Sequence, residues 1–168
     1  SFPVNNIALV NGRPQLLNLK ELIHHFVEHR HEVVVRRTRF DLKKAEDRLH
    51  IVLGLLIAQD NIDEVIHTIR AAKNPEEAKA ALIEKFGLSD IQSAAIIEMR
   101  LRALTGLEHG KLVAERDELE RQIAYFKEVL ADVSKQMEII KEELQEMKAK
   151  YGDERRSEII YSSEEFNP

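Results

Sequence analysis

A heptad pattern of apolar residues in the C-terminal third of the sequence constrains the fold more than any other feature. Its positions alternate in steps of four and three residues, which is typical of a coiled-coil seam. A helix of about 40 residues in this register would be roughly 60 Å long, and its apolar stripe needs a partner. The predicted seam residues are Leu119, Ile123, Phe126, Leu130, Val133, Met137, Ile140 and Leu144, continuing to Met147 and Tyr151.

A shorter stretch of the same pattern lies upstream and predicts that partner. Because about 50 residues separate the two stretches, the simplest arrangement is an antiparallel coiled coil within one chain, with a globular tip between its helices. We therefore predict a mainly α fold. The upstream seam residues are Val35, Thr38, Leu42, Ala45, Leu49, Val52 and Leu56.

Both ends of the chain carry short strand signals. Asn11-Gly12 separates two apolar runs, and this dipeptide favours the tight turn of a β-hairpin. After a predicted helix stop at Gly152, residues 158–161 read as another short strand. We expect the hairpin and this terminal strand to meet in one small sheet at the base of the coiled coil.

The segment between the two seams contains start and stop signals for short helices. Side chains that cap a helix N-terminus, and proline at its first position, mark the starts. The last of these helices is predicted to run to about Leu104, and Gly87 ends the one before it. The predicted starts are Asn61 with Glu64, Asn74 with Pro75, and Ser89 with Gln92.

These signals divide the chain into five segments. A helix break near residues 29–32 separates the first two. The segments are 1–30 with the hairpin and a helix, 31–60 as the first coiled-coil helix, 61–107 as the tip, 108–151 as the second coiled-coil helix, and 152–168 as a return strand and tail.

One segment of the tip is apolar on nearly all sides. Such hydrophobicity indicates burial on two sides, and the second side is interpreted as another copy of the tip. The alternative is a central helix that needs no partner. The predicted dimer-interface residues are Ala94, Ile96, Ile97, Met99, Arg100, Leu101 and Leu104.

Composition limits the other function classes. The formal charge of −5 disfavours a nucleic-acid-binding surface over the whole chain. The chain has no cysteine and no apolar run long enough to span a membrane, so we expect a cytoplasmic protein. His25 and His29 have the spacing of a metal-chelating pair but no further ligand, and we predict no metal, cofactor or catalytic site.

A basic run at Arg36, Arg37 and Arg39 has two interpretations. It is either a solvated face beside the seam or a contact to nucleic acid or to another part of a larger protein. The sequence leaves both open.

Several motifs resemble the A subunit of bacterial DNA gyrase, a type IIA topoisomerase, and to a lesser extent the A-type subunit of topoisomerase IV. The likeness covers essentially the whole chain in order. The motifs lie at residues 18–21, 34–40, 60–66, 99–108 and 151–156, and the most specific is Met-Arg-Leu-Arg-Ala-Leu-Thr-Gly-Leu-Glu at 99–108.

The resemblance implies a function that spacing alone does not. In that family the coiled coil ends in a tip that dimerises as the exit gate, or C-gate, for the transported duplex during ATP-dependent negative supercoiling. The family's catalytic tyrosine follows an arginine, whereas Tyr125, Tyr151 and Tyr161 do not. Mg²⁺ and ATP would be used by a partner B subunit in an A2B2 holoenzyme. We expect weak or no DNA binding by this segment, although DNA binds the parent enzyme.

Two other classes of function compete with this interpretation. One is a nucleic-acid-binding antiparallel arm like that of seryl-tRNA synthetase, which would carry basic residues along its outer faces. The other is an enzyme in its own right, for which the sequence offers no site. Mixed charges on the return helix and an apolar tip favour dimerisation.

Overall fold

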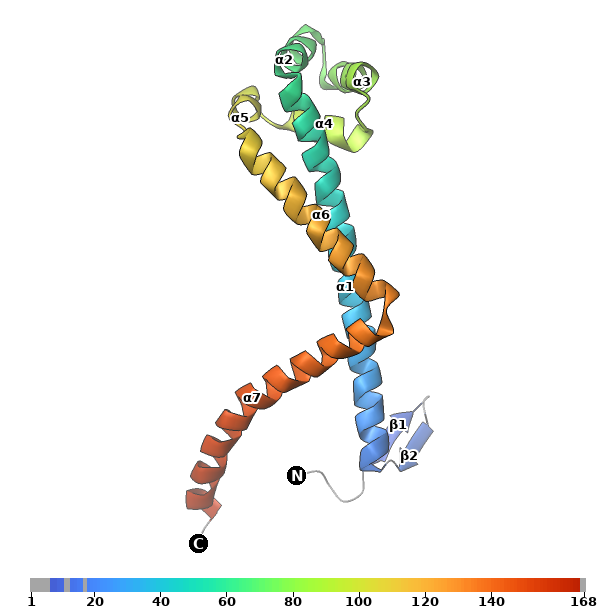
Figure 1. Ribbon diagram of the computed structural model, residues 1–168, viewed down its shortest axis with the longest axis vertical. Coiled ribbons are helices and arrows are strands. Elements are labelled where there is room, and N and C mark those ends of the chain that lie inside the picture. Colours follow the sequence, from blue (N-terminus) through green and yellow to red (C-terminus); the bar gives the residue numbers. More distant parts are fainter. Residues whose placement is uncertain (1–6, 11–12, 17, 167–168) are drawn as a thin grey trace. The chain divides into compact units, whose positions relative to one another are not determined.

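The computed structural model describes residues 7–10, 13–16 and 18–166, and these are mainly helical (Figure 1). Two strands, β1 (Ile7–Val10) and β2 (Arg13–Leu16), pair antiparallel, with Val10 opposite Arg13 and Ile7 opposite Leu16. The predicted turn residues Asn11-Gly12 lie outside the described residues.

The first helix, α1 (Leu19–Asp60), is 42 residues long and continuous. Its start is capped by Asn18, whose Oδ1 accepts a hydrogen bond from the backbone N–H of Glu21 at 2.9 Å. The predicted break near residues 29–32 is therefore wrong. That stretch contains neither glycine nor proline, and the buried side chain of Val34 just beyond it is held by packing.

The tip begins with two short helices, α2 (Ile62–Ala71) and α3 (Pro75–Phe86). The predicted start of α3 is confirmed, because the Asn74 side chain accepts a hydrogen bond from a backbone N–H in the first turn. Its predicted end at Gly87 is confirmed by a left-handed φ of 68°. Asn61 precedes α2 but its side chain makes no capping hydrogen bond.

The helix after Ser89 is shorter than predicted. A capping box between Ser89 and Gln92 opens α4 (Asp90–Glu98), as the sequence indicates, with hydrogen bonds of 2.9 and 3.1 Å. The chain then turns extended at Met99, whose ψ is 138°, before the short helix α5 (Leu101–Thr105). This turn lets the Met99 side chain pack against the core, so the helix does not reach Leu104 without interruption.

The return segment forms two helices, α6 (His109–Ala131) and α7 (Val133–Phe166), rather than the single predicted helix of residues 108–151. Asp132 separates them. Its Oδ1 accepts hydrogen bonds from the backbone N–H and the hydroxyl of Ser134, at 2.9 and 2.7 Å. A short polar side chain that binds the backbone in this way favours the start of a new helix over continuation of the old one.

The predicted terminal strand at residues 158–161 is also wrong, because α7 continues through Gly152 to Phe166. A single glycine costs a helix only about 1 kcal/mol relative to alanine. The residues just after Gly152 are mostly glutamate and arginine, which are good helix formers, so the helix continues past it.

The chain divides into two compact units. Unit 1 comprises residues 1–38 and 129–168, and unit 2 comprises residues 39–128. In unit 2, α6 runs antiparallel to α1, as the pairs Arg48 with Glu115 and Gln59 with His109 show (Figure 1).

The core of unit 2 joins this helix pair to the tip. Leu42, Leu49 and Phe126 are half-buried against it. Its buried residues are Ala45, Val52, Leu55, Leu56, Ala58, Val65, Leu82, Leu88, Ile96, Leu104, Leu112, Leu119 and Ile123.

In unit 1 only part of the predicted seam is buried. The predicted seam residue Ile140 is buried, together with Val129 and Gln136, whereas the predicted seam residues Val133 and Met137 are 59% and 39% exposed. The heptad is therefore interrupted directly after Asp132, where α6 ends and α7 begins. Val35, Leu130 and Leu144 are half-buried in this unit, and Met147 and Tyr151 are exposed.

Polar contacts join α1 to α7 within unit 1. Glu143 on α7 accepts hydrogen bonds from both Arg30 and Arg37 on α1. Gln136 lies beside His31 and donates to the backbone carbonyl of Val129 at 2.9 Å. Gln136 thus adds a second donor to a carbonyl at the end of α6 that already accepts from the backbone N–H of Asp132 at 3.3 Å.

Candidate dimerisation surface of the tip

A polar network holds the start of α4 against α1. Gln92 Nε2 donates to the backbone carbonyl of His50 at 2.7 Å, and the His50 Nε2 atom lies 2.5 Å from the Ser89 hydroxyl. These contacts turn Gln92, Ser93 and Ile96 toward the interior, where all three are buried.

The opposite face of α4 is therefore left in solvent. Ile91, Ala95 and Glu98 lie one and two turns apart and share this face. Ile91 is 62% exposed, an unusual position for a large aliphatic side chain. We call Ile91 and Ala95 the α4 stripe.

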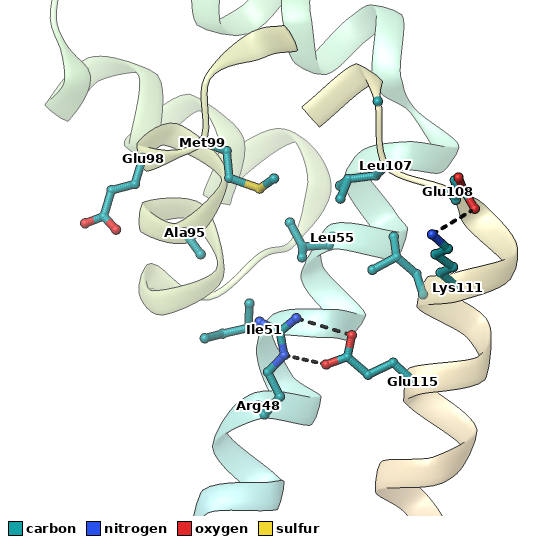
Figure 2. A pocket seen from close by; sticks show the side chains of 12 residues that line it. Arg48, Ile51, Leu55, Ala95, Glu98, Met99, Leu107, Glu108, Lys111 and Glu115 are labelled. Carbon is teal, nitrogen blue, oxygen red and sulfur yellow. Dashed lines mark hydrogen bonds and ion pairs between the residues drawn. The ribbon is translucent and has the colours of Figure 1, made fainter. Parts of the chain in front are cut away.

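A groove borders the α4 stripe (Figure 2). It has a volume of about 590 Å³ and is lined by residues of α1, α4 and α6 and of the connection before α6. Ile51 and Leu55 of α1 lie between the other walls, with Ala95 and Met99 on one side and Leu107 on the other. An apolar floor between helices is the kind of surface that accepts a helix or a side chain from a partner.

Charged side chains border the groove on the side of α6. Arg48 and Glu115 form two hydrogen bonds, of 2.6 and 3.2 Å, and Lys111 lies 3.5 Å from Glu108. The hydrogen bond from Arg48 lowers the pKa of Glu115 from its ordinary value. These four side chains already satisfy one another within the chain.

The predicted interface residues are only partly available to a second chain. Ile96 and Leu104 are core residues, so a partner cannot contact their side chains without opening the unit. Ala94, Ile97 and Met99 are half-buried, and Arg100 is exposed. The side chain of Leu101 is not among those that the structure describes.

Sequence reasoning missed the α4 stripe and the groove. From residue type alone, one expects Ile91 to be buried and Gln92 to be exposed. The polar network around Gln92 gives the opposite result: Gln92 is buried and Ile91 is exposed. The capping box was a usable signal, because it orients Gln92 toward the backbone of the preceding segment. No local sequence signal indicates that Ile51 and Leu55 of α1 form the floor of the groove. These two residues precede Ile91 and Ala95 of α4 by 40 positions in the chain.

The other candidate sites suggested by the sequence have less structural support. Among the described residues no group of three or more metal-ligating side chains comes together. His25 is exposed and lies near Glu28, and His29 is exposed as well. In the basic run, Arg37 pairs with Glu143, while Arg36 and Arg39 face solvent.

The described helices include none that is long and apolar enough to cross a membrane.

Comparison with known proteins identifies the relatives of this chain. The family model for the A subunit of DNA gyrase/topoisomerase IV matches residues 1–145. The DNA gyrase A subunits of Clostridium acetobutylicum and Staphylococcus epidermidis are 50% and 52% identical to it, each over 95% of the chain. The homologue from Streptococcus pneumoniae is 51% identical over 95%. The chain spans about a fifth of the length of these relatives, at 19%, 18% and 20%.

Proposed function

Because the chain belongs to the A-subunit family of DNA gyrase and topoisomerase IV, we propose that it forms the arm and tip of the exit gate of a type IIA topoisomerase. Residues 31–60 and 108–151 are the arm, and residues 61–107 are the tip. Two tips pair as a homodimer, and their separation releases the transported DNA duplex. The chemistry of cleavage lies elsewhere in the parent enzyme.

The observation that carries this proposal is the α4 stripe, with Ile91 exposed and Ala95 half-buried, beside a groove with an apolar floor where the tip meets the arm. Both lie in unit 2, whose core extends from the helix pair into the tip. The mixed apolar and charged lining of the groove suits an interface that opens in every cycle, because an obligate dimer core would be more apolar.

The charge of the chain supports a conduit for DNA. A net charge of −5 does not retain a departing polyanion. A nucleic-acid-binding arm would instead need a basic outer face, whereas α6 mixes both signs. In the proposed A2B2 holoenzyme the B subunit supplies the Mg²⁺ and ATP sites, and the enzyme works in the bacterial cytoplasm.

Gyrase is favoured over topoisomerase IV as the parent. The three relatives reported above are all named as A subunits of DNA gyrase. Negative supercoiling by the complete enzyme is the activity to which the gate would contribute.

A disulfide across the proposed gate tests the function in the complete enzyme. The chain has no cysteine, so Ile91→Cys introduces one thiol into this segment, at the most exposed large apolar residue described in the tip. We expect oxidation to join the two tips covalently and to block strand passage while DNA cleavage continues. Reduction should restore passage.

Glu84→Cys is the matched control, because Glu84 is exposed on α3, away from the groove. It should neither crosslink nor inhibit. If the Ile91→Cys enzyme is fully crosslinked and still passes duplexes at the normal rate, the tip is not the exit gate.

A further inference from the structure

We infer that the tip recognises a second copy of this chain by reciprocal charge pairs, with Glu98 of one copy facing Arg100 and Arg102 of the other. The inference rests on the proposed tip dimer and names the contacts that select the partner.

The three side chains form no ion pair within the described part of the chain. Glu98, Arg100 and Arg102 are exposed, and none of them is joined to another described residue in this way. Other charged residues near α4 and the groove do form ion pairs within the chain. They are Lys79 with Asp90 at 2.9 Å, Arg48 with Glu115, and Lys111 with Glu108.

The backbone places Glu98 and Arg100 on either side of Met99, which lines the groove, and Arg102 follows in α5. Glu98 ends α4, and Met99 and Arg100 are extended, with ψ of 138° and 141°. Figure 2 shows the Met99 side chain turned toward Leu55, with the Glu98 carboxylate at the outer edge of the lining residues. Met99 thus contributes to the groove, while the charged residues next to it in the chain, Glu98 and Arg100, are exposed.

A two-fold axis makes this arrangement self-complementary. In an isologous interface, if residue i contacts residue j, then j contacts i. One acidic and one basic site on either side of Met99 can therefore form two equivalent pairs across the two-fold axis. Charges at an interface rim mainly set specificity and association rate, since like charges in these positions repel.

Charge exchange between two variants tests the inference on the 168-residue chain itself. One variant carries Glu98→Arg, and the other carries Arg100→Glu with Arg102→Glu. We expect the dimer dissociation constant of each variant alone to rise about tenfold or more, because like charges then face each other. An equimolar mixture should associate as tightly as the wild type, since both sets of pairs are restored in the heterodimer.

Sedimentation velocity over a concentration series measures the association, and far-UV circular dichroism verifies the fold of each variant. Glu84→Arg, an equal charge change at an exposed site on α3, should dimerise like the wild type. The inference is overturned if both variants dimerise normally, or if mixing them restores nothing.

These results separate the inference from the proposed function. If both charge variants dimerise normally but Ile91→Asp does not, the tip dimer stands and only the charge pairing is wrong. A wild-type chain that remains monomeric at every concentration overturns both.

Discussion

Gly54 on α1 lies so close to Gln92 on α4 that a methyl group added to Gly54 would be 2.8 Å from the Gln92 Cβ and Cγ atoms. Real side chains do not approach so closely, and the affected atoms are near the backbone of α4. The same Gln92 side chain is hydrogen-bonded to the carbonyl of His50 and to the backbone N–H of Ser89. The absence of a side chain at Gly54 is thus what lets α4 dock on α1.

Gly54→Ala is therefore expected to destabilise unit 2 although alanine is the better helix former. Overpacking costs about 1–3 kcal/mol, which exceeds the gain in helix propensity of roughly 1 kcal/mol. Thermal unfolding measures the difference. Gly110→Ala is the matched control, because nothing lies within 4 Å of an added methyl group there, and its melting temperature should stay level or rise. A Gly54→Ala chain as stable as this control would show that α4 docks differently.

Glu143 should make the stability of unit 1 sensitive to acid. Burial raises the pKa of Glu143, but hydrogen bonds from Arg37 and Arg30 outweigh it, and the net pKa lies below the ordinary 4.5. A depressed carboxylate pKa stabilises the fold above the ordinary pKa, and this contribution is lost as the pH falls through the folded-state value. Glu143→Gln should thus cost roughly 1–2 kcal/mol near neutral pH and little in acid.

Urea unfolding at about pH 7 and at successively lower pH, down to about pH 2, measures this effect. Glu142→Gln removes the same charge from an exposed neighbour and should leave the pH dependence of the wild type intact. An equally steep pH dependence in the Glu143→Gln chain would contradict the assigned role of the two arginine contacts.

The seam register in unit 1 is testable within a single helical turn of α7. Ile140 is 3% exposed and Met137 is 39% exposed. Ile140→Ala should cost about 2–4 kcal/mol through lost burial and a residual cavity, and Met137→Ala should cost well under half of that. Chemical denaturation of both variants measures the two costs. Equally large losses would restore the uninterrupted heptad, in which both residues belong to the seam.

Ser93 is a buried polar residue inside the tip that is expected to lower its stability. It is fully buried, and its hydroxyl has no hydrogen-bond partner among the described residues. An unsatisfied buried hydroxyl costs about 1–3 kcal/mol, so Ser93→Ala should raise the melting temperature or leave it unchanged. Ser89→Ala, which removes the cap of the same helix, should lower it. A loss of stability in the Ser93→Ala chain would reveal a partner for this hydroxyl.

Helix ends that are set by contacts between residues close in sequence were predicted correctly. Asn74, Gly87 and Ser89 mark helix ends in the positions expected of them, because each acts on a backbone group within four residues. The antiparallel helix pair of unit 2 followed from the repeat of Val52, Leu56, Leu119 and Ile123, all of which are buried.

The failures share a different cause. The heptad continues through Asp132 in sequence, but the side chain of Asp132 starts a new helix and interrupts the seam directly after it. At residues 158–161 the apolar letters suit a strand, yet a strand requires a partner, whereas a helix satisfies its backbone locally and so continues from α7.

The sequence by itself determined that this chain is mainly helical, that two amphipathic stretches pair, and where α3 and α4 begin. These properties depend on periodicity and capping, which act over one or two turns. Only the tertiary structure decided that Gln92 is buried and Ile91 exposed, and that Ile51 floors a groove beside Ala95. Which face of α4 is covered depends on the shape of α1 at Gly54, and no pattern within α4 encodes the contour of a helix so far away along the chain.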